Sequence, residues 1–207
     1  RALSEVGGKG VFTKEIDRYV LEGDAEIAVH SMKDVETQLD PGIHLAAMLP
    51  RGDPRDAFLS PLAASVADLP QGALVGSASI RRKSQILRLR PDLEVVLCRG
   101  NVDTRLAKLA AGDVAATLLA AAGLKRLGRI AEATAILEPD EMLPAAGQGA
   151  VGITCRGDHA ELPALLAGID QRPTSIAVSC ERAVLARLDG SCRTPVAAHA
   201  VIGDGAI

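Results

Sequence analysis

Strand-like and helical segments alternate along almost the whole chain, and this alternation narrows the choice of fold more than any other feature. Short apolar runs typical of buried strands are followed by amphipathic stretches with helix caps. Strands are expected at residues 26–30, 45–49, 74–76, 93–98, 114–119 and 150–155, and helices at residues 14–22, 80–90, 103–111, 120–127, 160–167 and 174–188. The pattern predicts an α/β protein with a largely parallel sheet, in which ligands bind at the carboxyl ends of the strands.

The length of the chain bears on how these elements are divided. The 207 residues are enough for one large domain or two small ones. Residues 98–101 and 169–174 are the segments where the chain could cross between lobes. Two lobes with a cleft between them fit the pattern, and a single domain is the alternative.

The composition argues against several classes of protein. A net charge of -3 argues against a general nucleic-acid binder. Tyr occurs once, Phe twice and Trp not at all, so stacking platforms for single-stranded nucleic acid are almost missing. The apolar runs are too short to cross a bilayer, and no secretory signal is visible. We therefore expect a cytoplasmic protein that binds neither nucleic acid nor membranes.

The four cysteines lie in different settings. They form no C-x-x-C pair and have no histidine at metal-ligand spacing, so neither a metal site nor a disulfide framework is predicted. Cys98, Cys155 and Cys180 lie in apolar segments and are expected in the core. Cys192 lies in a glycine-containing turn before an apolar, strand-like run at residues 196–202. That setting fits a reactive thiol and fits a merely exposed thiol equally well.

A compact set of polar groups follows the first expected strand. Ser31, Lys33 and Asp34 place a hydroxyl, an ammonium and a carboxylate within four residues. The charge of Lys33 would keep Asp34 ionised, so that Asp34 could stabilise a cation or carry a proton. A solvated loop with an ordinary surface ion pair is the alternative interpretation. Residues 147–149 (GQG) form another flexible turn, which either approaches a ligand or only reverses the chain.

Residues 81–108 are strongly basic. They contain eight Lys or Arg residues and three acids, a net charge of +5, so the rest of the chain carries -8. One interpretation is a helix face coated with solvated charge, and Arg88 and Arg90 fit it. The other is a site for an anion. No nucleotide-binding glycine motif follows a strand, so a nucleotide phosphate is not the obvious anion.

The residues that follow the expected strands favour the anion site. Ser79, Arg81 and Arg82 occupy a strand-to-helix junction, where free backbone N–H groups and the helix dipole attract negative charge. Arg99 follows the next strand, and Arg105 lies in the helix after it. Arginine is suited to bidentate capture of carboxylate or phosphate groups. We therefore predict that these junctions bind an anion.

Eight stretches of the chain occur in the order found in one enzyme family. They are GGKG at residues 7–10 with FTKE at 12–15, AVHSMKDV at 28–35, RGDPRDAF at 51–58, SIRR at 79–82, RGNVDTRL at 99–106, AGLKRLG at 122–128, LPAAGQGAVG at 143–152 and DGSC at 189–192. They are spread over nearly the whole chain, from residue 7 to residue 192. In these stretches the chain resembles the porphobilinogen deaminases, also called hydroxymethylbilane synthases.

The resemblance implies a fold, an activity and a set of site residues. Members have three α/β domains, of which the first two resemble periplasmic binding proteins with a cleft between them. They are transferases that join four porphobilinogen molecules head to tail, release ammonia each time, and so make hydroxymethylbilane for porphyrin and haem biosynthesis. Their dipyrromethane cofactor is bound through a thioether to a cysteine that corresponds to Cys192. Their essential carboxylate corresponds to Asp34, which would stabilise cationic pyrrole intermediates and assist proton transfer. The residues implied to hold the acetate and propionate side chains are Lys9, Ser31, Lys33, Ser79, Arg81, Arg82, Arg99, Arg105 and Arg126.

The same resemblance suggests how the chain is divided. Domain 1 is expected at residues 1–50 and 149–168, domain 2 mainly at 51–148 after a hinge near 50–55 or 98–101, and the start of domain 3 at 169–207. The family's first strand and most of domain 3 are expected to lie outside this chain, so the isolated piece need not be active. The parent protein is expected to be a monomer. The rival hypothesis is a non-catalytic, two-lobed anion-binding module that needs no Cys192.

Overall fold

The chain folds into two compact units. The computed structural model describes residues 11–190 and 194–203. Unit 1 is formed by residues 1–52 and 145–207, and unit 2 by residues 53–144, so the chain leaves unit 1 once and returns once. None of the described helices is both long and apolar enough to span a bilayer.

Unit 1 contains a three-stranded sheet with the order β1-β8-β2. Its elements are α1 (Val11–Glu22), β1 (Ile27–Ser31), the 3-10 turn η1 (Met32–Asp34), β2 (Ile43–Met48), β8 (Val151–Arg156), α5 (Leu162–Ala167) and α6 (Arg172–Arg187). β8 is antiparallel to both of its neighbours. The prediction of a largely parallel sheet is therefore wrong here, because the central strand is the returning segment and runs against the two strands beside it.

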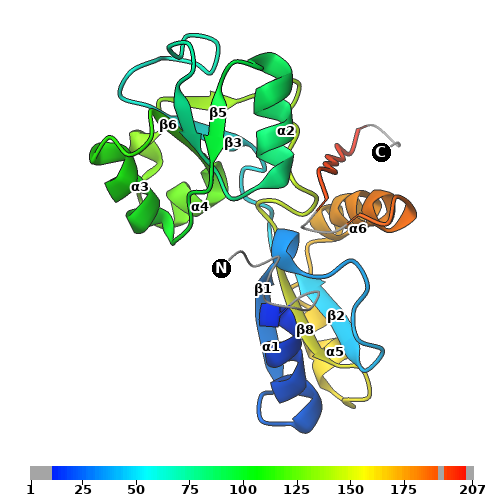
Figure 1. The fold of residues 1–207 in the computed structure, drawn as a ribbon. Coiled ribbons are helices and arrows are strands. Elements are labelled where there is room, and N and C mark those ends of the chain that lie inside the picture. The colour runs from blue at the N-terminus through cyan, green and yellow to red at the C-terminus, as the bar shows by residue number, and fades with distance from the viewer. Residues whose placement is uncertain (1–10, 191–193, 204–207) are drawn as a thin grey trace. The chain divides into compact units, whose positions relative to one another are not determined.

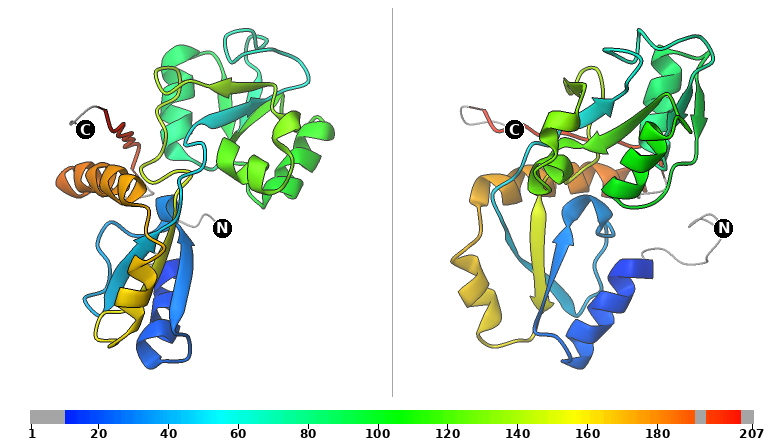
Figure 2. Two further views of the ribbon diagram at one scale, coloured as in Figure 1. Left: turned by 180° about the vertical axis from the view of Figure 1, so that it is seen from behind. Right: turned by 90° about the vertical axis from the view of Figure 1, so that its left-hand side faces the viewer.

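Helices cover both faces of this sheet, and the alternation of side chains along the strands explains which helix covers which face. Val20 of α1 packs against Ala28 and Ile43 on one face. Leu166 of α5 packs against Ile153 and Cys155 on the other. Figure 2 shows α1 and α5 separated by the strands.

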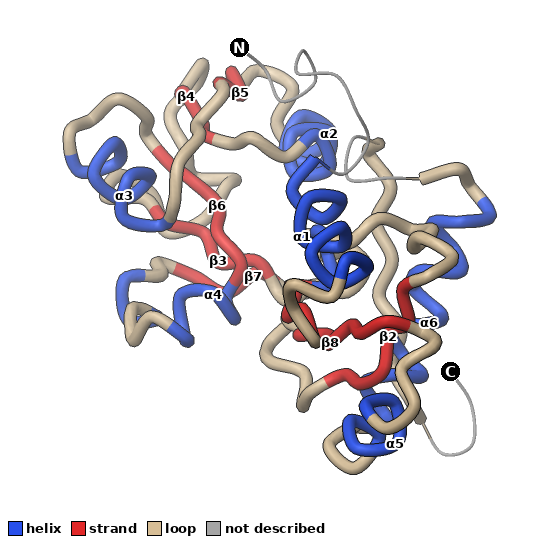
Figure 3. Tube along the Cα trace, turned by 90° about the horizontal axis from the view of Figure 1, so that it is seen from below, coloured by secondary structure: helices blue, strands red, loops and turns tan. Residues whose placement is uncertain are grey.

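Unit 2 contains a five-stranded sheet with the order β5-β4-β6-β3-β7. Its elements are β3 (Asp56–Leu59), β4 (Leu74–Gly76), α2 (Ile80–Leu89), β5 (Glu94–Val96), α3 (Val102–Ala110), β6 (Ala116–Ala120), α4 (Ala121–Arg126), the 3-10 turn η2 (Ile130–Glu132) and β7 (Ala135–Leu137). β4 is parallel to β5 and β6, whereas β3 is antiparallel to β6 and β7. The sheet is thus mixed; Figure 3 shows its strands in red.

The core of unit 2 lies on both faces of its sheet. Phe58 and Leu118 form a directly opposed pair and pack with Ile86 of α2. Leu59 and Leu119 point to the opposite face, where they pack with side chains of α3 and α4. Figure 1 accordingly shows α2 on one side of the strands and α3 and α4 on the other. Fully buried aliphatic side chains supply most of this core, as the scarcity of aromatic residues requires.

The structure departs from the sequence-based elements at three places. β3 and β7 were not predicted, because they are only four and three residues long and β3 is buried on both faces, so no alternation marks it. Residues 196–202, predicted to be strand-like, form neither helix nor strand. Cys98 and Cys155 are buried, as predicted, whereas Cys180 is only partly buried.

A buried carboxylate in unit 1 binds both segments that lead to and from unit 2. Glu181 of α6 accepts hydrogen bonds from Nη1 and Nη2 of Arg51 at 2.7 and 3.0 Å. It also accepts from the backbone N–H of Gly147 at 2.7 Å and from that of Ala200 at 2.9 Å. Arg51 lies just before the chain leaves unit 1, and Gly147 just after it returns. Glu181 therefore holds together the two points of unit 1 at which the chain leaves for unit 2 and returns from it.

Replacing Glu181 by Gln tests this role. The substitution leaves Arg51 without its charge partner in a nearly buried site, so we expect the free energy of unfolding to fall by about 3 kcal/mol. Glu161→Gln, at an exposed position before α5, is the matched control. Urea denaturation of the full chain followed by circular dichroism measures both variants. Equal midpoints for the two would contradict the assignment.

Candidate functional site

The carboxyl ends of three parallel strands meet at one edge of the sheet in unit 2. β4, β5 and β6 are parallel, and each leads into a helix. The backbone N–H of Ser77 donates to the carbonyl of Val96 at 2.9 Å, which holds the ends of β4 and β5 together. The predicted anion-binding residues that follow these strand ends are Ser79, Arg81 and Arg82 after β4, Arg99 and Arg105 after β5, and Arg126 after β6. The predicted parallel arrangement is confirmed for these three strands.

Two side chains begin the helices at this edge. The hydroxyl of Ser79 accepts a hydrogen bond from the backbone N–H of Arg82 at 3.3 Å, which confirms the predicted cap of α2. The side chain of Asn101 caps α3 in the same way, through the N–H of Thr104 at 2.9 Å. These caps fix where each helix starts and hence where its first arginines lie.

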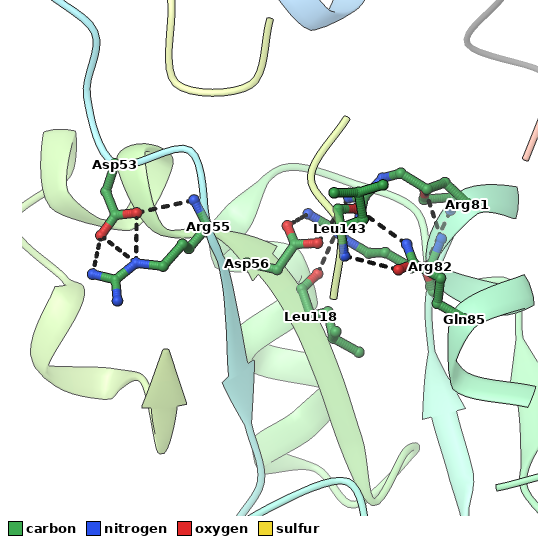
Figure 4. A network of polar contacts seen from close by, with 10 residues as sticks. Asp53, Arg55, Asp56, Arg81, Arg82, Gln85, Leu118 and Leu143 are labelled. Carbon is green, nitrogen blue, oxygen red and sulfur yellow. Dashed lines mark hydrogen bonds and ion pairs between the residues drawn. The ribbon is translucent and has the colours of Figure 1, made fainter. Parts of the chain in front are cut away.

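Arg81 and Arg82 do not project into solvent, because both bind one buried aspartate (Figure 4). Nη2 of Arg81 donates to Oδ2 of Asp56 at 2.8 Å, and Nη2 of Arg82 donates to Oδ1 of Asp56 at 2.8 Å. Their Nη1 atoms donate to the backbone carbonyls of Leu143 at 2.6 Å and Leu118 at 2.9 Å. Each arginine is only 5% exposed, and Asp56 is fully buried. The terminal nitrogens of both arginines are thus engaged inside the protein.

The direction of β3 explains why Asp56 lies here. Because β3 is antiparallel to β6, its first residue, Asp56, pairs with Ala120 at the carboxyl end of β6. Burial alone would raise the pKa of Asp56, but the charges and hydrogen bonds of Arg82 and Arg81 outweigh it and hold that pKa well below its usual value. Sequence reasoning missed this residue. The only signal was an acid directly before the buried run Ala57–Leu59, and its partners are 25 and 26 residues away.

This edge keeps donors and positive charge that the described residues do not satisfy. Two guanidinium groups share one carboxylate, and the Nε atoms of Arg81 and Arg82 are buried without a hydrogen-bond partner among the described residues. Arg105 uses its Nε to donate to the carbonyl of Gly100 at 2.9 Å, and no described residue accepts from its two terminal nitrogens. Burial, and next the charge of Arg82, hold the pKa of Arg105 below its usual value. An anion at this edge would relieve both deficits.

The other predicted residues of this group differ in exposure. Arg99 is partly buried in the loop before α3, and Arg126 is exposed at the last position of α4. Lys9 and Cys192 lie outside the described residues. Arg88 is exposed, as expected for a solvated helix face. Arg90 does not fit that expectation, because it is partly buried just after α2, pairs with Asp92 and donates to the carbonyls of Ala67 and Leu69.

In unit 1, the polar set after β1 lies on the short turn η1. Met32 is 1% exposed and belongs to a core cluster with Val178 of α6, so the turn is fixed by its first residue. Ser31 and Lys33 are partly buried. The carboxylate of Asp34 is exposed, and no described residue donates a hydrogen bond to it. Asp34 therefore presents an available negative charge on a rigid support.

The turn at residues 147–149 supports η1 from one side. Gly147 has a φ of +72°, a conformation that L side chains rarely adopt, and a Cβ there would lie 2.9 Å from Cβ of Met32 and 3.0 Å from its carbonyl carbon. The glycine lets the returning chain touch the backbone of η1. Gln148, beside it, is 1% exposed. Residues 147–149 thus have a structural role, in keeping with the interpretation that this turn serves to reverse the chain.

Comparisons with known proteins agree with this architecture. Residues 1–164 match the family model "Porphobilinogen deaminase, dipyromethane cofactor binding domain", and residues 175–207 match "Porphobilinogen deaminase, C-terminal domain". Porphobilinogen deaminase of Nitrobacter hamburgensis is 57% identical over 96% of this chain. The chloroplastic porphobilinogen deaminase of Oryza sativa subsp. japonica is 56% identical over 97% of it. The chain spans 63% and 56% of the lengths of these two relatives.

A solved structure shares the fold without close sequence similarity. A Bacillus subtilis lipoprotein, named as methionine-binding, superposes with a TM-score of 0.50 and 12% identity, over 78% of this chain and 76% of its own. That likeness concerns the fold alone and agrees with the expected α/β fold of periplasmic-binding-protein type. The family models and the two relatives decide the ancestry: the chain belongs to the porphobilinogen deaminase family.

Proposed function

We propose that this chain serves the reaction implied by its family, in which four porphobilinogen molecules are joined head to tail with loss of ammonia to give hydroxymethylbilane. The observation that carries the proposal is the excess of buried positive charge and unsatisfied donors at the strand ends of unit 2. A pyrrole bearing acetate and propionate side chains is a dianion, and such an edge suits it. The exposed Asp34 supplies the opposite charge that the chemistry requires.

The residues present fit a dipyrromethane cofactor. Its carboxylates would accept hydrogen bonds from the terminal nitrogens of Arg105 and from the orphaned Nε atoms of Arg81 and Arg82. Arg99, Arg126 and Ser79 follow the same strand ends and would add to this binding. When bound, the cofactor supplies the pyrrole end to which the first substrate ring is joined. We propose Cys192, which follows α6 in the sequence, as its point of attachment.

We assign proton transfer and charge stabilisation to Asp34. The substrate's amino group takes up a proton and leaves as ammonia when the C–N bond breaks, and the methylene carbon becomes cationic. A carboxyl group can donate the proton, and the resulting carboxylate can stabilise the cation. Asp34 is exposed and held on a rigid turn, so it can serve both needs in succession. Lys9, Ser31 and Lys33 would hold the carboxylates of the substrate beside it.

The setting of the protein belongs to the same proposal. We infer a cytoplasmic monomer whose partner is the small molecule porphobilinogen and which acts without nucleic acid or membrane. Buried free thiols at Cys98 and Cys155 are in keeping with a reducing compartment.

Asp34→Asn tests the catalytic assignment. The amide keeps the shape of the side chain but carries no negative charge and no transferable acid proton. Turnover should fall on the order of 10²- to 10⁴-fold, with cofactor loading and thermal stability unchanged. Steady-state rates of hydroxymethylbilane formation by the full-length protein measure this. Near-normal turnover would remove Asp34 from the chemistry.

Cys192→Ser tests the attachment point. A serine hydroxyl is a poor substitute for a thiolate, so the intact mass of the purified full-length protein should lose the dipyrromethane adduct that the parent carries. Cys180→Ser, at a partly buried position on α6, is the control and should keep the adduct. A parent without any adduct would favour the reversible anion-binding module instead.

Arg105→Gln tests the anion site. Because the described residues leave its terminal nitrogens without acceptors, its loss should change unfolding free energy by less than about 0.5 kcal/mol. KM for porphobilinogen, or the yield of loaded protein, should worsen roughly 10- to 100-fold, as expected for a lost hydrogen bond to a charged group. Arg88→Gln, on the exposed face of α2, is the matched control. Equal changes in KM and in loading for the two variants would show that Arg105 is only a surface charge and does not bind the anion.

A further inference from the structure

We propose that Arg182 and Thr37 are positioning residues, which fix the segment carrying Asp34 against the C-terminal end of α6 and Gly190, two residues before Cys192 in the sequence. The inference rests on the proposed function of Asp34 and Cys192. Neither Arg182 nor Thr37 was singled out by sequence reasoning. Both lie in unit 1, so every contact used here is internal to one unit.

Arg182 binds the loop that follows η1 through backbone carbonyls alone. Its Nη1 donates to the carbonyl of Val35 at 3.2 Å, and its Nη2 donates to the carbonyls of Glu36 and Thr37 at 2.7 and 3.1 Å. Three successive carbonyls directly after Asp34 are thereby held by one guanidinium on α6. A planar group with several fixed donors can do this, whereas an ammonium cannot hold the same three in one plane.

Thr37 binds Gly190, which follows α6. Its hydroxyl donates to the carbonyl of Gly190 at 2.9 Å. Gly190 is buried, and its N–H donates to the carbonyl of Leu185 at 2.7 Å, so this residue is tied to the last turn of α6. Asp189, just before it, has a φ of +49° and is the one non-glycine residue with a positive φ in the described part of the chain. Gly190, two residues before Cys192 in the sequence, is thus bonded to the Asp34 loop.

The start of η1 is held by other contacts. Met32 is buried against Val178 of α6, and Gly147 packs on the backbone of Met32. Arg182 binds the residues that follow Asp34, so the short segment is held at both ends. Asp34 lies between these supports and has none of its own from the described residues. The position of Asp34 is therefore set by its neighbours. A carboxylate that must react with a covalently attached pyrrole chain has to be positioned in this way.

Hydrogen exchange tests the geometric part without any use of activity. In the full-length protein, Arg182→Gln should raise amide exchange in residues 33–38 at least severalfold, most clearly at Val35, whose N–H donates to the carbonyl of Met32 at 3.4 Å. The guanidinium that binds the carbonyls of residues 35–37 is lost, so the loop opens locally. Thr37→Val, a milder change of nearly equal volume, should raise exchange in the same segment and at Gly190. Arg187→Gln, exposed in the last turn of α6, is the control. Unchanged exchange in both test variants overturns the proposal.

A double-mutant cycle tests the link to Asp34. Arg182→Gln should lower kcat on the order of 10- to 100-fold with KM nearly unchanged, since a small displacement of a catalytic group has such effects. Arg182→Lys should recover part of the loss. In the Asp34→Asn background, Arg182→Gln should cause no further loss, because the group it positions is gone. Losses that multiply, or a variant that loses stability but keeps kcat per folded molecule, overturn the positioning role.

The two proposals fail in different ways. If Asp34→Asn alone retains normal turnover, the catalytic assignment falls, whatever Arg182 does. If Asp34→Asn is inactive and Arg182→Gln is fully active, only the positioning role falls. Loss of activity in both single variants, with non-additive kcat and raised exchange at residues 33–38, supports the proposal.

Discussion

The carboxylate of Asp56 is buried without exposure to water, and its burial is tolerated because two guanidinium groups each take one of its oxygens. Those same guanidiniums reach the carbonyls of Leu118 at β6 and Leu143 at the end of unit 2. One acid thereby joins β3, α2, β6 and the returning segment. Removing Asp56 would leave both guanidinium groups without a counter-charge in a site that excludes solvent.

Unit 1 follows the same principle with a different acid. Glu181 receives Arg51 and two backbone N–H groups, and its neighbour on α6, Arg182, binds the loop after η1. α6 therefore organises both the crossings to unit 2 and the turn that bears Asp34. The carboxylate of Asp34 is exposed, but the residues on either side of it are fixed. Each supporting residue is held by a charged partner or by a core contact.

Local signals in the sequence predicted what is local in the structure. The Ser79 cap, the parallel strands β4 to β6 and the placement of arginines after them all follow from periodicity and capping. The partner of Arg81 could not be found in this way, because it depends on β3 entering the sheet antiparallel beside β6. The same limit applied to Glu181, which in sequence is one polar residue on a long helix. Counting charges identified a basic segment but could not show which of its arginines pair with buried groups of the protein.

That distinction changes the energetics of binding. Arg81 and Arg82 supply two positive charges against one negative charge within a nearly solvent-free network. Arg105 adds a third positive charge, and burial and the charge of Arg82 already lower its pKa. Holding such an excess costs free energy in the absence of an anion. A ligand that brings carboxylates to this edge repays that cost, so part of its binding energy becomes stability of unit 2. An anion-dependent stability of this kind follows from the charges themselves, and it links the folding of the domain to its ligand.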